Sequence, residues 1–299
     1  RCEWRGVNLA ICLLFWAMES LVRSALPHLA QSTLDSLWRS SKSLHPAIRA
    51  VLLARRAKRR DLSDGQEAVP VLVVNDVDEE PHPAVAYTKC CVCDAAMAAR
   101  IADAVAAVAC AAPYADGRLK ASAPHPIVEC GDAGCACFVV GRGVRAPLEV
   151  FKTSRRGWGL RCRRALARGE FVCEYAGELL SSAEAARRQR RAVPNYIFVV
   201  REHSRAGTWR TIIDPTHTGN VGRFANHSCD PNLAVHLVRV ASLVPRIALF
   251  ASRDVPALEE LTISYGDSGA GGGAAPGART PCECGAAACG GWLPCDLSA

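Results

Sequence analysis

The spacing of the cysteines constrains this chain more than any other feature of its sequence. Sixteen of the 299 residues are cysteine, and three pairs of them are separated by a single residue. These pairs are Cys91 and Cys93, Cys135 and Cys137, and Cys282 and Cys284. Cysteines this close along the chain have poor geometry for a mutual disulfide, but their thiolates suit one zinc ion. We therefore expect a reduced compartment and structural zinc rather than a disulfide framework.

The last of these pairs begins a Cys-x-Cys-x4-Cys pattern in the C-terminal tail, which ends at Cys289. Three thiolates are one ligand short of a closed tetrahedral zinc site. Cys229 is the candidate fourth ligand, and it lies in the run "GNVGRFANHSCDPNL". The residue types of this run favour turns, so it is either an ordinary polar loop or part of a site. If zinc binds, it holds the tail over the loop and covers a pocket between them; the alternative is a set of free thiols.

The second half of the chain has the pattern of a β-rich α+β fold. From residue 148 onward, short apolar runs are separated by Gly, Pro, Asn and Asp, which predicts strands of five or six residues. The predicted strands are "FVCEYAGELL", "NYIFVV", "TIIDP", "AVHLVRV" and "RIALFA". The exception is "SSAEAARRQRR", where Ser181 or Ser182 would cap a short helix. With half of its residues hydrophobic and 22% charged, the chain has an ordinary globular composition.

The first half is less regular. The apolar stretch "NLAICLLFWAM" (residues 8–18) is too short to span a bilayer, and we interpret it as a buried helix or translated noise rather than an export signal. Because the chain starts at Arg, we expect an internal fragment or a misassigned leading exon. The basic run "RRAKRR" (residues 55–60) is typical of a solvated helix face. A strand is predicted at 69–74 and a helix at 95–112, and the Gly- and Ala-rich residues 268–280 read as a flexible linker.

Five motifs together identify a resemblance that none of them carries alone. "GWGLR" (157–161), "EYAGE" (174–178), "GRFANHSCDPNL" (222–233), "ELTISYGD" (260–267) and the cysteine tail occur in the order found in SET-domain protein-lysine methyltransferases. The segment "GQEAVPVLVVNDVDEEPHP" resembles the entry to the pre-SET region of the Su(var) branch. The resemblance implies an N-terminal segment at 1–60, a degenerate pre-SET region at 61–147, a SET domain at 148–267, a linker at 268–281 and a post-SET element at 282–298.

The resemblance also implies a fold, a cofactor and a substrate. The fold would be the SET fold, with knot-like threading of the "NHSC" segment beneath the strand that leads to Tyr265. The methyl donor would be S-adenosylmethionine, and the acceptor a lysine of a histone tail. Lysine 9 of histone H3 comes first and lysine 36 is the alternative. Such a protein would act on nucleosomes in the nucleus, on chromosomes, with no membrane partner.

Individual residues take roles from the matching motifs. Tyr265 matches the catalytic tyrosine, and Tyr175 matches a second active-site tyrosine. The residues that match cofactor contacts are Gly157, Trp158, Gly159, Tyr196, Arg223, Asn226 and His227. The post-SET zinc would be held by Cys229, Cys282, Cys284 and Cys289. In the pre-SET region, the best candidates for zinc ligands are Cys91, Cys93, Cys130, Cys135 and Cys137.

The chain departs from the family pattern at two places. Two positions before the catalytic tyrosine the family usually has Phe or Tyr, whereas this chain has Ile263, which predicts more room beside the amine and di- or trimethylation. The family pre-SET uses nine cysteines to hold three zinc ions. Between Cys90 and Cys137 there are seven, Gly141 stands about where another is expected, and "GRGVRAP" replaces the usual "N-R-x-x-Q". The three-zinc cluster is therefore doubtful.

Three other functions compete with histone methylation. A methyltransferase acting on a non-histone protein would carry the same motifs. A catalytically weak copy that binds chromatin would explain the eroded pre-SET region, although Tyr265, Asn226, His227 and the tail cysteines argue against it. A DNA-binding zinc protein would suit the net charge of +7 and the basic run, but no recognition-helix pattern supports direct contact with DNA.

Overall fold

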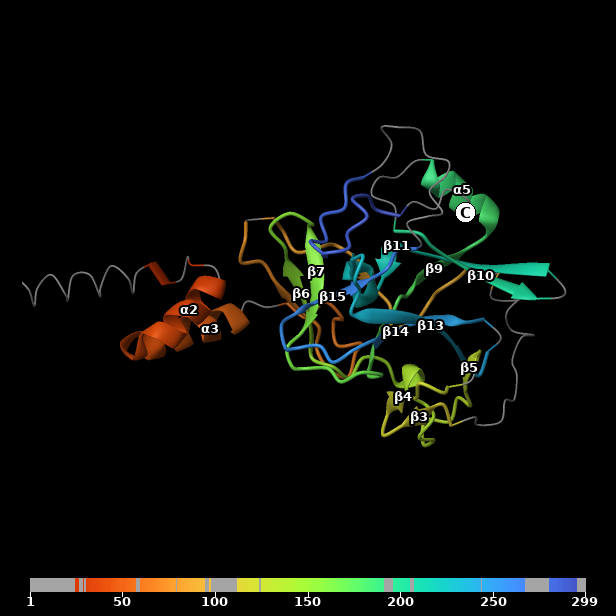
Figure 1. The fold of residues 1–299 in the computed structure, drawn as a ribbon, viewed down its shortest axis with the longest axis horizontal. Coiled ribbons are helices and arrows are strands. Elements are labelled where there is room, and N and C mark those ends of the chain that lie inside the picture. Colours follow the sequence, from red (N-terminus) through yellow and green to blue (C-terminus); the bar gives the residue numbers. More distant parts are fainter. Residues whose placement is uncertain are drawn as a thin grey trace, which may run out of the picture. The chain divides into compact units, whose positions relative to one another are not determined.

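The computed structural model describes residues 25–26, 29, 31–57, 60–78, 80–94, 97, 112–123, 125–190, 196–204, 207–242, 244–266 and 280–294. The apolar stretch at 8–18, nearly all of the predicted helix at 95–112 and all but the last residue of the predicted linker at 268–280 lie outside these residues. The chain divides into two compact units: residues 1–60 with 75–79, and residues 61–74 with 80–299. Figure 1 shows both, and each is described by itself.

The first unit is helical. Helices α2 (Gln31–Ser40) and α3 (His45–Ala57) are joined by the short 3₁₀ helix η2 (Lys42–Leu44). Apolar side chains pack between them, because each helix has one apolar face. The buried residues of this small core are Leu26, Leu34, Leu44 and Ile48. Within the described residues, no helix has both the length and the apolar character that crossing a bilayer requires.

The second unit consists mainly of strands, which confirms the predicted β-rich class. A five-stranded sheet has the order β1 (Leu72–Val74), β6 (Leu148–Lys152), β7 (Trp158–Cys162), β15 (Glu260–Ile263) and β12 (Asn226–His227). The first strand is shorter than the predicted 69–74. Pro70 has no N–H for a ladder, and the N–H of Val71 donates to a carboxylate oxygen of Asp61 instead of to a strand.

Two further sheets complete this unit (Figure 1). One has the order β10 (Phe198–Ser204), β11 (Gly207–Gly219) and β2 (Ala86–Tyr87), with β9 (Gly177–Leu180) also paired to β11. The other has the order β5 (Ile127–Glu129), β13 (Leu233–Val240), β14 (Arg246–Ala251) and β8 (Phe171–Glu174). A small hairpin of β3 (Tyr114–Ala115) and β4 (Arg118–Leu119) packs against this last sheet, with the ring of Tyr114 stacked on that of Phe250.

The run predicted as one strand, "FVCEYAGELL", is two strands in different sheets. Strand β8 ends at Glu174 and β9 begins at Gly177, so the chain changes sheets at Tyr175 and Ala176. Gly177 is needed at this crossing, because a Cβ there would lie 2.7 Å from the backbone of Asp214. The chain turn places Tyr175 between the two sheets, with only 6% of its surface exposed.

The predicted short helix is confirmed as α5 (Ser182–Gln189), and Ser181 is its cap. The hydroxyl of Ser181 accepts a hydrogen bond from the backbone N–H of Glu184 at 3.3 Å. The predicted strands "TIIDP", "AVHLVRV" and "RIALFA" are found within β11, β13 and β14, whereas β10 begins at Phe198 and so includes only the last three residues of "NYIFVV". Strand β12 lies beside β15, as the family fold requires, while the knot-like threading stays a prediction.

Candidate active site and zinc centre

Three of the motifs meet on the five-stranded sheet because of how β15 is paired. On one side β15 runs parallel to β12, with Asn226 opposite Thr262 and His227 opposite Ile263. On its other side it runs antiparallel to β7, which carries the "GWGLR" motif. After β12 the pairing continues through a hydrogen bond of 3.0 Å from the backbone N–H of Ser228 to the carbonyl of Ile263. Segments about a hundred residues apart in the sequence therefore form one site.

His227 connects the tyrosine of this site to a cysteine. The backbone N–H of Tyr265 donates to Nδ1 of His227 at 3.2 Å, and Nε2 lies 3.4 Å from Sγ of Cys229. Because Nδ1 accepts a hydrogen bond, the proton of the neutral imidazole is on Nε2, where it faces the sulfur. Burial, and next the charge of Arg156, lower the pKa of His227 and favour this neutral ring. The imidazole thus contacts both the sulfur of Cys229 and the backbone N–H of Tyr265, and it orients the two groups.

Tyr265 has its hydroxyl group inside the site. Although 42% of the residue surface is exposed, the hydroxyl donates to the carbonyl of Ala225 at 3.1 Å. Burial raises the pKa of Tyr265 to about 12, and the nearby Tyr196 adds to this shift. The hydroxyl therefore stays protonated at neutral pH, with its hydrogen on the Ala225 carbonyl and the lone pairs of its oxygen left to accept a hydrogen bond.

The other two tyrosines of the prediction lie against the same place. The hydroxyl of Tyr175 donates to the backbone carbonyl of Tyr196 at 2.7 Å. Burial raises the pKa of Tyr175 well above its usual value, and Tyr265 is the next largest cause. The guanidinium of Arg223 stacks 4.4 Å from the centre of the Tyr196 ring and donates to the carbonyl of Thr216 at 2.9 Å. These residues thus form one wall of a single site.

The two glycines of "GWG" are favoured at their positions for different structural reasons. Gly157 has φ of +65° with open space around its missing side chain. Gly159 is crowded instead, since a Cβ there would lie 3.0 Å from the Glu260 carboxylate and from two other side chains. Between them Trp158 donates through Nε1 to Glu80 at 3.1 Å, and its carbonyl accepts from the amide of Asn226 at 3.1 Å.

Ile263 is fully buried within the main core of the second unit. The structure thus gives it a packed environment beside the site rather than an exposed one. Sequence reasoning missed two charged residues of this region, Glu260 and Arg156, which form an ion pair between β15 and the turn before β7. The sequence feature that could have revealed Glu260 is the acidic first residue of "ELTISYGD", because the other three residues of this strand are apolar or uncharged and buried.

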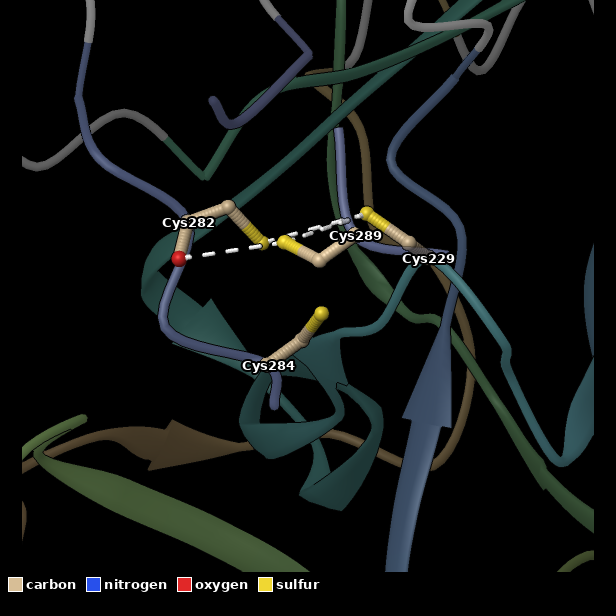
Figure 2. Close-up of side chains that lie close together, drawn as sticks. All are labelled: Cys229, Cys282, Cys284 and Cys289. Atoms are coloured by element: carbon tan, nitrogen blue, oxygen red, sulfur yellow. Dashed lines mark hydrogen bonds between the residues drawn. The ribbon is translucent and has the colours of Figure 1, made fainter. Parts of the chain in front are cut away.

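The four cysteines of the predicted post-SET site come together, as Figure 2 shows. Their sulfur atoms all lie within 4.8 Å of one another, and Sγ of Cys229 is 4.0 Å from that of Cys282 and 3.9 Å from that of Cys289. Four Zn–S bonds of about 2.3 Å in a tetrahedron place the sulfurs about 3.8 Å apart. The donor set and its spacing therefore fit one zinc ion, held by Cys229, Cys282, Cys284 and Cys289.

The pre-SET cysteines do not form the family's three-ion cluster within the described chain. Sγ of Cys137 lies 3.1 Å from that of Cys130 and 3.3 Å from that of Cys135, so these three could share one ion. Cys91 is elsewhere, with its thiol 3.6 Å from the carboxylate of Glu174, and Cys93 joins neither group. Among the described residues of this region, the cysteines fit one ion but not three.

Residues 138–141, which follow these cysteines, are held by interactions other than the metal bonds of the family's three-zinc cluster. The ring of Phe138 occupies the space beside Gly141, since a Cβ there would lie 2.1 Å from it. The buried carboxylate of Glu129 accepts from the backbone N–H groups of Val140 and Gly141 at 2.8 and 3.0 Å, and from the hydroxyl of Tyr114 at 2.6 Å. An apolar core and a carboxylate thus stabilise the segment.

We expect the whole chain to bind two zinc ions, one in each cysteine group. The intact family pattern would bind four, which is three in the cluster and one in the tail. Native mass spectrometry of the purified chain, before and after acid release of metal, counts the ions directly. Four ions would show that the family cluster persists, and a single ion would show that Cys130, Cys135 and Cys137 hold no metal.

Known proteins resemble this chain over the region that contains these motifs. The model of the SET domain family matches residues 157–266. The probable histone-lysine N-methyltransferase set-23 of Caenorhabditis briggsae is 37% identical over an alignment that covers 61% of this chain and 78% of that protein. This chain belongs to the SET-domain family. The crystal structure of the methyltransferase domain of human SETMAR agrees with the fold at a TM-score of 0.65 and 33% identity, covering 79% of this chain and 98% of that one.

Two relatives show how much of a longer protein the SET-domain chain accounts for. Human histone-lysine N-methyltransferase SETMAR is 41% identical over 58% of this chain, which is 28% of SETMAR. SUVH6 of Arabidopsis thaliana, described as H3 lysine-9 specific, is 33% identical over 77% of this chain and 35% of its own length. The structure of SUVH6 in complex with S-adenosylmethionine matches at a TM-score of 0.65, covering 78% of this chain and 55% of that one. The chain thus spans less than two thirds of these relatives.

Proposed function

We propose that this chain is a protein-lysine N-methyltransferase that uses S-adenosylmethionine and modifies a histone tail. The observation that carries the proposal is the convergence of Tyr265, Asn226, His227 and the four-cysteine group around the β12–β15 pair. These are the residues that the SET motifs assign to catalysis, cofactor binding and zinc. Relatives that bear the same motifs are named histone-lysine N-methyltransferases.

The cofactor site would lie between the "GWG" turn and the "NH" strand. Asn226 uses both amide hydrogens within the protein, on Trp158 and Glu260, which leaves its carbonyl oxygen as an acceptor. Arg223 and the Tyr196 ring supply a planar face. S-adenosylmethionine supplies a methyl group on a positively charged sulfur; Gly157, Trp158, Gly159, Tyr196, Arg223, Asn226 and His227 would bind it.

The residues of the channel must prepare the lysine amine. A free lysine has a pKa near 10.4, so it is protonated at neutral pH and cannot accept a methyl group. A partly dry channel beside a positive charge lowers this pKa by desolvation and repulsion. The hydroxyl oxygen of Tyr265 would accept a hydrogen bond from an N–H of the neutral amine and so direct the amine lone pair toward the methyl group. Tyr175, fixed by its bond to the Tyr196 carbonyl, would shape the channel. No side chain needs to act as a general base, because the proton leaves to water.

The proposed substrate is lysine 9 of histone H3, with lysine 36 as the alternative, and the proposed location is the nucleus, on chromosomes. SUVH6, a relative with the same fold, carries lysine-9 specificity in its name. The test is to incubate the chain and S-adenosylmethionine with H3 peptides that span either lysine, and to locate added methyl groups by fragmentation mass spectrometry. Peptides with arginine at the target position serve as controls. Methylation of neither peptide, with methylation of another nuclear protein, would replace the histone proposal by the non-histone one.

A chromatin-binding relic is the second candidate, because the pre-SET region lacks the family's cysteine arrangement among the described residues. A relic would bind nucleosomes but would transfer no methyl group to any histone or nuclear extract, even with zinc and cofactor bound. The peptide experiment above separates the two candidates, provided that cofactor binding is measured on the same preparation.

Ile263→Phe should lower the number of methyl groups added to each lysine. Ile263 is fully buried in the main core, two residues before Tyr265, so a larger ring must take space from its neighbours, which would include the proposed channel. We expect mainly mono- and dimethyl product where the unmodified chain gives di- and trimethyl product. Overpacking of a core typically costs about 1–3 kcal/mol, so Ile263→Leu, which keeps the volume, is the matched control. A product distribution unchanged by Ile263→Phe would contradict a role for this position.

A further inference from the structure

We propose that Glu260 is a positioning residue that determines which face of the Asn226 amide is presented to the cofactor. This inference rests on the proposed function, because it concerns the same cofactor site. Glu260 is the first residue of β15, between the two strands that carry the cofactor motifs. Neither the motif comparison nor the family match assigns it a role, and its side chain is largely covered, with 18% exposed.

The side-chain amide of Asn226 is held by the protein at its nitrogen end. An amide nitrogen has two hydrogens to donate. Here Nδ2 donates to Oε1 of Glu260 at 2.8 Å and to the carbonyl of Trp158 at 3.1 Å, so both hydrogens are used. Within the described chain no donor contacts the other end of the side chain, Oδ1. A carboxylate is an acceptor only, so Glu260 can bind the NH₂ end of Asn226 but not its oxygen. The carbonyl oxygen must therefore face the site.

The second oxygen of Glu260 fixes the carboxylate itself. Oε2 accepts a charge-assisted hydrogen bond from the guanidinium of Arg156 at 2.5 Å. Another nitrogen of the same guanidinium donates to the carbonyl of His227 at 3.4 Å. One ion pair thus holds both the side chain of Asn226 and the backbone of the next residue, and it connects the turn before β7 to β12.

Gly159 supports this arrangement from the other side. A Cβ at this position would lie 3.0 Å from Oε1 of Glu260, which is closer than side-chain atoms normally pack. Any larger residue would push the carboxylate away from Asn226. Part of the requirement for the second glycine of "GWG" therefore comes from Glu260 rather than from the cofactor. The ligand chemistry that this geometry selects is an N–H or ammonium donor on the cofactor, facing Oδ1 of Asn226.

The test is the affinity of the whole chain for S-adenosylhomocysteine, measured by calorimetry in four forms: unchanged, Glu260→Gln, Asn226→Ala and the double variant. Glutamine has nearly the same shape, but its amide cannot accept from Asn226 and Arg156 with both ends. We expect Glu260→Gln to raise Kd about tenfold, which corresponds to one hydrogen bond to a charged group. It should leave the KM for peptide and kcat at saturating cofactor within about twofold, a separation that a general loss of structure would not give.

The double variant shows whether Glu260 affects cofactor binding through Asn226 or independently of it. If Glu260 acts through Asn226, the double variant should bind no more weakly than Asn226→Ala alone. The matched control is Glu259→Gln, the adjacent carboxylate, which accepts from Asn232 and pairs with Arg253 instead. Should Glu260→Gln fail to fold, Glu260→Asp keeps the charge and should show an intermediate Kd. Additive effects, or an unchanged Kd for Glu260→Gln, would overturn the inference alone. A complete lack of cofactor binding by the unchanged chain would instead overturn the proposed function.

Discussion

Tyr265→Phe is expected to reduce kcat at least a hundredfold and to leave the Kd for S-adenosylhomocysteine within about twofold. The hydroxyl lies inside the site, on the carbonyl of Ala225, and burial keeps it protonated by raising its pKa to about 12. Loss of one preorganised hydrogen-bonding group that acts mainly in the transition state typically costs a factor of about 10²–10³. Single-turnover transfer to a histone peptide and calorimetry with the cofactor product measure the two quantities separately.

Tyr175→Phe is the matched control for this prediction. It also removes one hydroxyl from the same wall, which donates to the carbonyl of Tyr196 at 2.7 Å, but only 6% of the Tyr175 surface is exposed, against 42% of the Tyr265 surface. We expect a loss of about 1 kcal/mol in stability, typical of one buried hydrogen bond, and a decrease in kcat smaller than that of Tyr265→Phe. Equal effects of the two changes, or a kcat for Tyr265→Phe within tenfold of the unchanged chain, would contradict the assignment of Tyr265.

Cys289→Ser is expected to release one zinc ion per chain and to abolish both cofactor binding and methyl transfer. Sγ of Cys289 lies 3.9 Å from Sγ of Cys229, in the four-cysteine group that joins the tail to the "NHSC" loop. Removal of one of four thiolates leaves an open site with much weaker affinity, and metal affinity is coupled to the folding of the segment that it holds. Without the ion the tail is no longer fixed over the loop, and Cys229, whose sulfur lies 3.4 Å from Nε2 of His227, is no longer held in place by the metal.

Metal analysis, cofactor titration and transfer activity on the same preparation test this second prediction. Cys90→Ser is the control, because Cys90 is exposed and belongs to neither cysteine group of the described chain. It should keep the zinc content and the activity. A Cys289→Ser variant that retains its full zinc content, or one that loses zinc but methylates at the normal rate, would show that the tail does not complete the site.

The parts of the site that depend on residue type and spacing could be predicted from the sequence. Cys229 was expected to join Cys282, Cys284 and Cys289 because three thiolates lack a fourth, and the structure brings all four together. The cap at Ser181 followed from the preference of hydroxyl side chains for helix starts. Both depend on short-range chemistry that a sequence displays directly.

The parts that depend on pairing between distant segments could not be predicted in the same way. The bond between Asn226 and Glu260 joins residues 34 positions apart, and the pair of Glu260 with Arg156 spans 104. Strand β12 has only two residues, too few to show a period. The sequence also could not show that the ring of Phe138 would fill the space at Gly141, since that depends on a side-chain rotamer.

We propose that the site around Tyr265 transfers methyl groups to a histone lysine. The most direct measurement is intact mass spectrometry of histone H3 after incubation of octamers with the zinc-loaded chain and S-adenosylmethionine bearing a deuterated methyl group. We expect H3 to become heavier by one to three labelled methyl groups, all on a single lysine, and we expect no labelled H3 with Tyr265→Phe. Unlabelled H3 from a chain that binds zinc and cofactor normally would contradict it.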